Sequence, residues 1–266
     1  MVLLLALALP FSARAENSGL ERLTTRENVF GWEAVGRLDL PQGFCTGVLI
    51  APDLVLTAAH CMYDARRRAM IEPSQMTFRA GLTDGVAIAE RKGLRHVSHP
   101  AYRHDVGVTP DNVRHDVALL QLDAPIPSAI AAPFSVGQMG GRGSELSVVS
   151  YAVGRDDALS WQRTCRILGK GQGLVGFDCD VTFGASGAPV FDRTGRRATI
   201  VSLVSAGGAQ DAYGMELAPR VEEVKSALRS GAGVVELTNT RRSTFGFISP
   251  DRRNSGSGAK FVPASP

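Results

Sequence analysis

Three short segments of this 266-residue sequence each carry a side chain that can take part in acyl transfer. His60 stands in the segment LVLTAAHC, Asp116 in RHDVALLQL and Ser186 in TFGASGAPV. A serine hydroxyl becomes a nucleophile when an imidazole takes its proton and a carboxylate holds that imidazole in the correct tautomer. These residue types therefore predict nucleophilic catalysis by Ser186, with His60 as the base and Asp116 as the orienting carboxylate.

Glycines flank the candidate nucleophile on both sides, at Gly184 and Gly187. A glycine two residues before a serine lets the loop adopt a conformation that turns its amide groups outward. Backbone N–H groups aimed in this way stabilise the negative charge that develops on a carbonyl oxygen during acyl transfer. We therefore expect the amides of Gly184 and Ser186 to form an oxyanion hole.

The elements that must position these residues read as short strands separated by turns. Residues 46–50 and 54–57 flank a hairpin-like connection, and residues 117–122 form a further buried strand that ends before two prolines. Residues 217–228 have helical apolar spacing and are followed by Gly231, which predicts one helix near the end of the domain. Many short strands with glycine-rich turns favour an all-β barrel or sandwich. Further strands are expected at 146–153, 165–168, 188–191, 198–204 and 213–217.

Composition excludes several classes of protein. With 44% hydrophobic and 21% charged residues, the sequence is neither a low-complexity disordered chain, a coiled coil nor a multi-span membrane protein. The net charge of +3 is reduced to +2 without Arg14, and residues 230–266 alone contribute +3 from five basic and two acidic groups. The globular part therefore carries about −1, so no nucleic-acid-binding face is expected.

The first residues resemble a processing signal. Residues 2–9 are an unbroken apolar run, and Ala13-Arg14-Ala15 offers small residues at a cleavage site. We expect a signal peptide over 1–15 and a secreted or periplasmic protein without a membrane span; a buried N-terminal strand or helix is the alternative. The predicted organisation then continues with an N-terminal segment or pro-segment over 16–31, the main domain over 32–229, and a basic, disordered tail over 230–266.

The three motifs together resemble the trypsin/chymotrypsin-like serine peptidases. The shared patterns are Thr-Ala-Ala-His-Cys at His60, Asp-Val-Ala-Leu-Leu at Asp116 and Gly-x-Ser-Gly-x-Pro at Ser186, in that family's order. The resemblance spans about residues 32–229. It implies two six-stranded antiparallel β-barrels with the active site in the cleft between them, plus a C-terminal helix. It also implies a monomeric endopeptidase that acts on protein or peptide substrates without a cofactor or metal.

The position before the nucleophile departs from the trypsin-like zymogens. Those proteins carry an aspartate there that pairs with the new N-terminus after activation, whereas this chain carries Ala185. The loop without that aspartate is similar to the bacterial branch that includes the glutamyl endopeptidases. The activation switch of the zymogens is therefore not expected in this chain.

Four cysteines in an exported chain indicate two disulfides with three possible connectivities, or else free buried thiols. The resemblance implies a bridge between Cys45 and Cys61 beneath the histidine, which leaves Cys165 and Cys179 as the second pair.

Two residues are candidates for substrate binding, Asp180 and Ser205. Asp180 lies six residues before Ser186, where trypsin-like enzymes carry the carboxylate that selects arginine or lysine. Here no cysteine follows it to shape the pocket wall, so a tryptic preference is one of several open alternatives. Glutamyl specificity needs a cationic or histidine side chain, and residues 199–208 contain none.

A different class of function also fits the fold. A peptidase-like binding or scaffold protein would keep the barrels without turnover, and a complete set of catalytic residues disfavours it. An esterase would use the same chemistry, but its nucleophile lies between a strand and a helix at a different spacing. Residues 62–85 lack the paired acids of a calcium loop, so no metal is expected.

Overall fold

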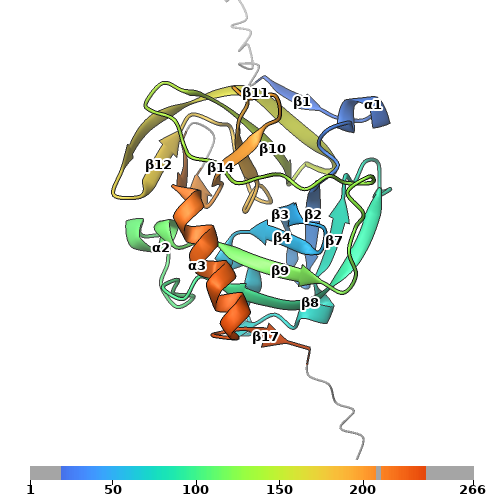
Figure 1. Cartoon of the computed structure of the whole chain (residues 1–266), viewed down its shortest axis with the longest axis vertical. Helices are drawn as coiled ribbons and strands as arrows, with labels where there is room; N and C mark the ends of the chain where they lie inside the picture. Colours follow the sequence, from blue (N-terminus) through green and yellow to red (C-terminus); the bar gives the residue numbers. More distant parts are fainter. Residues whose placement is uncertain (1–18, 208–210, 238–266) are drawn as a thin grey trace, which may run out of the picture.

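The first sheet is a closed barrel. The computed structural model describes residues 19–207 and 211–237, and Figure 1 shows the two sheets with α3 lying beside them. The sheet order is β8-β7-β2-β3-β4-β9, and β9 pairs back onto β8, so six strands close on themselves. The bounds are β2 (Val35–Leu40), β3 (Gly43–Ala51), β4 (Leu54–Thr57), β7 (Thr77–Ala80), β8 (Ala89–Ser98) and β9 (Ala118–Leu122).

Apolar side chains from facing strands fill the interior of this barrel. Leu56 is paired with Val48 on one side and with Leu119 on the other, and all three are fully buried. A barrel of six short strands leaves room only for side chains, so its lumen is a packed core. This rigid body holds the ends of β4 and β9 in fixed positions.

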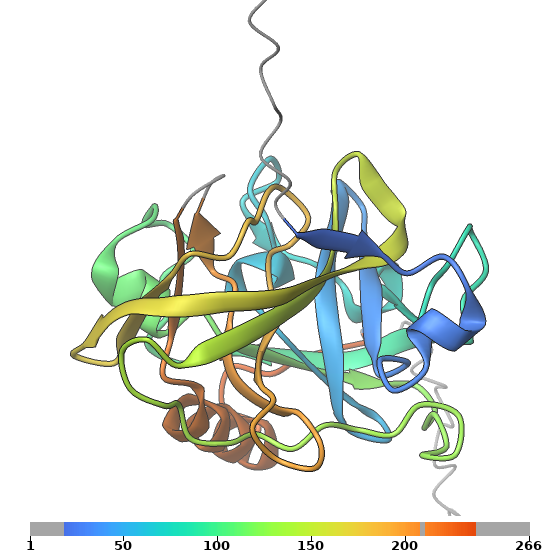
Figure 2. The ribbon, with the colours of Figure 1, turned by 90° about the horizontal axis from the view of Figure 1, so that it is seen from above.

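The second sheet curls into a half-barrel. Its order is β14-β13-β10-β11-β12-β16-β15, with β1 paired onto β11, and no strand pairing joins its two edges among the described residues. Figure 2 shows β1 lying along the long strand β11. The bounds are β1 (Leu20–Arg22), β10 (Glu145–Ala152), β11 (Arg155–Gly171), β12 (Leu174–Phe177), β13 (Pro189–Asp192), β14 (Thr199–Leu203), β15 (Ala206–Gly207) and β16 (Ala212–Met215).

The expected helix is α3 (Leu217–Ser230), which ends at Gly231 in the left-handed conformation with a φ of 78°. Its buried face includes Val221 and Val224, which join the core of the first barrel. Two shorter helices are capped by threonine side chains, α1 (Arg26–Val29) and α2 (Pro110–Arg114). The remaining small elements are β5 (Tyr63–Asp64), β6 (Ala69–Met70), β17 (Val235–Glu236) and the 3₁₀ turns η1 (Ala59–Met62) and η2 (Pro73–Gln75).

The predicted all-β class with a C-terminal helix is confirmed, and so are the hairpin of β3 with β4 and the strand β9. The second barrel differs in detail, because no strand pairing joins its edges within residues 19–207 and 211–237. The strand expected at 165–168 is part of β11, which is 17 residues long. Its length allows β11 to pair with β10, β12 and β1 in turn.

The chain ends fall partly outside the described residues. The predicted signal peptide at 1–15 lies there, as does most of the predicted tail. Within the described part, Leu23 and Val29 are buried in the core, so residues 20–31 belong to the folded body. At the other end, β17 pairs with β8, so the first residues of the expected tail form an edge strand. Among the described residues, no helix is both long enough and apolar enough to cross a bilayer.

Candidate active site

His60 and Asp116 meet because they follow and precede neighbouring antiparallel strands. β4 ends at Thr57, which is paired with Ala118 at the start of β9. His60 comes three residues after the end of β4, on the 3₁₀ turn η1, and Asp116 comes two residues before β9. Both side chains therefore emerge at the same edge of the first barrel.

Two hydrogen bonds fix the histidine to the carboxylate. Asp116 Oδ2 lies 2.7 Å from His60 Nδ1, and Asp116 Oδ1 accepts the backbone N–H of His60 at 2.9 Å. The Asp116 side chain is 3% exposed, whereas the imidazole is 35% exposed and reaches the solvent. The carboxylate is thus a buried acceptor that orients an accessible ring, with Nε2 facing away from it.

Burial and pairing act in opposite directions on both groups. Burial disfavours the charged imidazolium, but the charge and the hydrogen bond of Asp116 outweigh it, so the pKa of His60 is raised. Burial likewise disfavours the Asp116 carboxylate, but the charge of His60 and the hydrogen bonds it receives keep the pKa of Asp116 below its ordinary value. The arrangement can therefore hold a proton on the imidazole beside an ionised carboxylate.

Ser205 lies between β14 and β15, and its hydroxyl supports the carboxylate. Ser205 Oγ donates to Asp116 Oδ2 at 2.6 Å, so this oxygen accepts from both Ser205 and His60. The sequence predicted Ser205 as a substrate-binding residue. It lines the cleft, and its hydroxyl is engaged with Asp116.

The Ser186 loop is anchored to the first barrel by one buried threonine. Thr46, on β3, donates its backbone N–H to the Ser186 carbonyl at 2.9 Å and its hydroxyl to the Gly184 carbonyl at 3.0 Å. The same hydroxyl accepts the N–H of Tyr151 at 3.0 Å. Sequence reasoning missed Thr46, and only its position beside Cys45 could have drawn attention to it. It fixes the loop across the interface of the two sheets.

Two amides of this loop have no hydrogen-bond partner among the described residues, those of Gly184 and Ser186. The amides of Ala185 and Gly187, in contrast, donate to carbonyl groups of the second sheet and its loops. Phe183 directs its carbonyl oxygen to the Val153 amide at 2.7 Å. Because C=O and N–H point in opposite directions across a trans peptide, the Gly184 N–H faces away from Val153. These are the two amides that the sequence predicts as an oxyanion hole, and that role stays a prediction.

His60, Asp116, Gly184 and Ser186 line one cleft of about 800 Å³. No hydrogen bond of the Ser186 hydroxyl is present among the described residues. In ligand-free enzymes the bond between nucleophile and base is often long and shortens only when substrate binds. The described geometry thus brings the three predicted residues to one cleft and joins two of them directly.

Comparison with known proteins decides the family. The family model described as a trypsin-like peptidase domain matches residues 45–198, which is more than half of the chain. The chain belongs to the trypsin-like peptidase family. The resemblance inferred from the motifs is thereby confirmed.

Two curated relatives illustrate the range of this peptidase family. The domain is 23% identical over 196 residues to the glutamyl endopeptidase of Bacillus licheniformis, covering 71% of this chain and 58% of that protein. It is 36% identical over 83 residues to the trypsin of Sarcophaga bullata, covering 31% of this chain and 28% of that protein. The match therefore spans less than two thirds of either relative.

Solved structures of peptidases share the fold. A Glu endopeptidase in complex with MPD superposes with a TM-score of 0.67 at 20% identity, covering 79% of this chain and 96% of the other. The thermostable serine protease AL20 from an extremophilic microorganism has a TM-score of 0.60 at 18% identity, covering 74% of this chain and 97% of the other. The protease Anisep from Arthrobacter nicotinovorans has a TM-score of 0.59 at 15% identity, covering 74% of this chain and 96% of the other. At these identities the likeness is one of fold.

Two disulfides brace this peptidase domain near the cleft. Cys45 on β3 is bonded to Cys61 on η1, directly after His60, and Cys165 is bonded to Cys179. The atoms of Cys45, His60 and Cys61 lie close enough to suggest a metal site. Both sulfurs are in the disulfide and are not thiolate ligands, so this group does not fit a zinc ion.

Asp180 lies in the cleft of the peptidase domain, and the half-buried Arg155 stands near it. Arg155 donates to the side chain and carbonyl of Ser150, while its Nη2 is buried without a partner in the described structure. Burial lowers the pKa of Arg155, and the negative charge of Asp180 opposes that effect.

Proposed function

We propose that this protein is an exported serine endopeptidase that hydrolyses peptide bonds through an acyl-enzyme. The observation that carries the proposal is the buried Asp116, which holds His60 at two points in the cleft that Ser186 also lines. The family supports a hydrolase, and the free amides of Gly184 and Ser186 support acyl chemistry. The two disulfides fit an oxidising compartment outside the cytoplasm.

In the proposed mechanism the Ser186 hydroxyl attacks the scissile carbonyl carbon as His60 Nε2 takes its proton. Asp116 accepts from Nδ1 and stabilises the imidazolium that forms. The carbonyl oxygen becomes an oxyanion, which the amides of Gly184 and Ser186 hold. When the tetrahedral intermediate collapses, the C–N bond breaks and His60 gives its proton to the leaving amine, which leaves an ester on Ser186.

Deacylation repeats these steps with water as the nucleophile. His60 takes a proton from water as the oxygen attacks the ester carbon, and the second oxyanion occupies the same amides. His60 then returns the proton to Ser186 Oγ as the ester bond breaks and the acid product leaves. The enzyme is regenerated without a cofactor, because each proton that His60 takes is given back within the cycle.

For specificity, we propose that an uncharged side chain fits beside Ser186. The described lining of the cleft contains no lysine or arginine, which disfavours an acidic substrate side chain. The neighbouring wall includes the apolar Val181, Val204 and Ala206.

The test is cleavage of a peptide library by the mature protein with its disulfides intact, read by mass spectrometry. We expect endoproteolytic cleavage, with uncharged residues enriched before the cleaved bond, and no cleavage by a Ser186→Ala variant. A folded protein that leaves the whole library intact would contradict the endopeptidase proposal. A strict preference for arginine, lysine or glutamate would contradict the proposed specificity only.

A further inference from the structure

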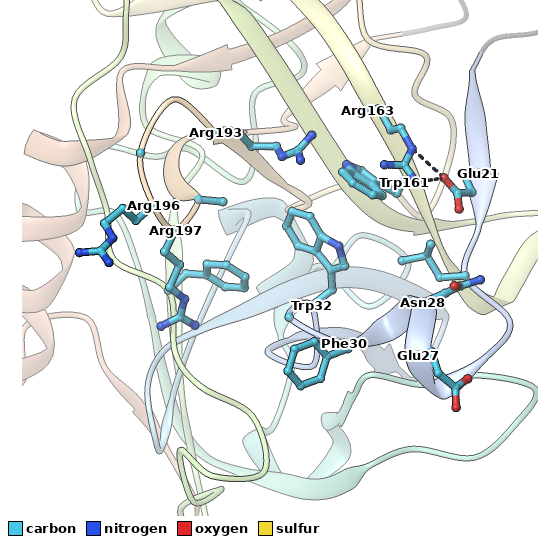
Figure 3. Close-up of a pocket in the computed structure, with 15 residues that line it drawn as sticks. Glu21, Glu27, Asn28, Phe30, Trp32, Trp161, Arg163, Arg193, Arg196 and Arg197 are labelled. Carbon is cyan, nitrogen blue, oxygen red and sulfur yellow. Dashed lines mark hydrogen bonds and ion pairs between the residues drawn. The ribbon is translucent and has the colours of Figure 1, made fainter.

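A second pocket, separate from the cleft, is lined by both tryptophans of the chain. It has a volume of about 450 Å³ and shares no lining residue with the cleft that contains Ser186. We call it the tryptophan pocket, and Figure 3 shows its walls, which come from the β1–α1 segment, β11 and the turn between β13 and β14. The residues that carry the argument are Phe30, Trp32, Phe134, Trp161, Arg163 and Arg193.

The floor of the tryptophan pocket is aromatic. The ring of Trp32 lies 5.2 Å from that of Trp161 and 5.9 Å from that of Phe134, and both indoles are 8% exposed. At the rim, Phe30 is 81% exposed, which is unusual for a large apolar side chain with a packed core nearby. The floor and rim together offer apolar contact to an incoming ring.

The two indole nitrogens differ in their hydrogen bonding. Trp161 Nε1 donates to the hydroxyl of Ser147 inside the second sheet. Trp32 Nε1, in contrast, has no hydrogen-bond partner among the described residues and is not fully enclosed. An indole N–H at the edge of a pocket is a donor available to a ligand.

Arg193, which has no acidic partner among the described residues, stands over this floor. The guanidinium carbon of Arg193 lies 4.7 Å from the ring centre of Trp161, and Figure 3 shows the group reaching toward that indole. Arg163 stacks on the same ring at 3.9 Å, but it is also paired with Glu21. Arg193 makes no hydrogen bond or ion pair with any described residue, so its donors are free to bind a carboxylate in the bidentate manner that guanidinium favours.

We propose that the tryptophan pocket binds an acidic peptide segment that carries an aromatic side chain. The aromatic ring lies against Phe30 and the edge of Trp32, and a neighbouring carboxylate is bound by Arg193. The pocket thus holds part of a separate partner polypeptide that is not at the cleavage cleft. This binding does not depend on the proposed catalysis.

A nucleic acid is the less favoured occupant of a site with tryptophan and arginine. Stacking of a base needs an open aromatic face, and two guanidinium groups already stack on Trp161 while Trp32 is buried among other rings. These features favour a short acidic segment, in which one carboxylate is placed beside one ring.

The tryptophan fluorescence of the protein reports on this pocket, because both tryptophans of the chain line it. The experiment uses the mature Ser186→Ala protein, so that no peptide is consumed, and a tryptophan-free probe, acetyl-Asp-Glu-Phe-Glu-Asp-amide. The control probe replaces the acids by asparagine and glutamine. We expect a saturable change in tryptophan fluorescence with the acidic probe, at least about tenfold weaker binding of the neutral probe, and weaker binding at high salt.

Matched variants locate the site. Arg193→Ala is expected to weaken binding of the acidic probe about tenfold while the neutral probe is unaffected. Arg66→Ala, which removes another exposed arginine that does not line the pocket, is expected to change nothing. Because Arg193 is exposed and makes no hydrogen bond or ion pair within the described part of the chain, its variant should keep the wild-type urea midpoint. A loss of binding then reports the pocket and not unfolding.

Several results would overturn the proposal: no saturable signal, equal affinity for acidic and neutral probes, no effect of Arg193→Ala, or tighter binding of a single-stranded oligonucleotide than of the acidic probe. The outcome is separable from that of the catalytic proposal. If the protein reacts at Ser186 but does not bind the probe, only the peptide-binding inference is contradicted. If the protein binds the probe but has no reactive serine, only the endopeptidase proposal is contradicted.

Discussion

Asp116 contacts His60 through both oxygens of its carboxylate, one on the ring nitrogen Nδ1 and one on the backbone amide of the same residue. The second contact matters because it fixes the position of the carboxylate relative to the main chain of η1. The ring can then take only the tautomer and rotation that present Nε2 to the cleft. We propose that this pair makes His60, on η1, an oriented base.

Replacing Asp116 by asparagine tests this orientation. The amide keeps the shape of the side chain but favours the wrong tautomer of His60, so we expect kcat to fall about 10⁴-fold with a small change in KM. The measurement is steady-state cleavage of a peptide substrate found in the library. Asp123→Asn, at an exposed acid after β9, is the matched control and should keep wild-type activity. A loss below tenfold in Asp116→Asn would contradict the assigned role.

The pH dependence follows from the pKa shift of His60. The base works only when neutral, and the carboxylate of Asp116 raises the pKa of His60 above its ordinary value of 6.5. Activity should therefore fall as the pH drops through that raised pKa, so kcat/KM should have an acidic limb with an apparent pKa above 6.5. In Asp116→Asn the carboxylate charge is gone while burial remains, and the residual activity should have its limb at lower pH. A limb that does not move between the two proteins would contradict the assignment.

The conformation of Gly187 predicts that adding a single methyl group there strongly destabilises the folded protein. Its φ is 76°, and a Cβ there would lie 2.2 Å from Thr57 Oγ1 and 2.5 Å from the Thr46 carbonyl oxygen. The backbone cannot move away without breaking the Thr46 anchor of the Ser186 loop. We expect Gly187→Ala to lower the free energy of unfolding by more than about 2 kcal/mol. The folded variant should also be less active than the wild type.

The control for this variant is Gly171→Ala, since a Cβ at Gly171 meets no atom within 4 Å and its φ is ordinary. Urea unfolding of both proteins gives the two free energies. Equal stability of the two variants would show that the Gly187 conformation is not required.

The bridge between Cys45 and Cys61 closes a loop with a sequence separation of 16 residues. Removing it by Cys45→Ala with Cys61→Ala should lower the free energy of unfolding by about 3 kcal/mol, because the unfolded chain gains freedom. The bridge also holds η1, so the variant should lose activity at temperatures at which it is still folded. Circular dichroism and peptide cleavage, measured over the same temperature range, separate the two effects. Activity that persists up to the unfolding transition would contradict the role in positioning His60.

The sequence was informative where the chemistry is local. The flanks of His60, Asp116 and Ser186 predicted the family, and apolar spacing with Gly231 predicted α3 within about a turn. The contacts of Thr46 and Ser205 were not predictable, because each joins segments about 90 or more residues apart that only the folded sheets bring together. The open edge of the second sheet was likewise hidden, since strand patterns do not state which edges pair. The tryptophan pocket was missed for the same reason, because Trp32, Trp161 and Arg193 are far apart in the chain.

The central claim is that Ser186 is a nucleophile activated by His60, and a fluorophosphonate probe tests it most directly. The account predicts a single covalent adduct on Ser186 of the folded, disulfide-intact protein, located by peptide mapping. Labelling should be absent in Ser186→Ala and strongly reduced in His60→Ala. A folded protein that forms no adduct, or that reacts at a different residue, would contradict the account.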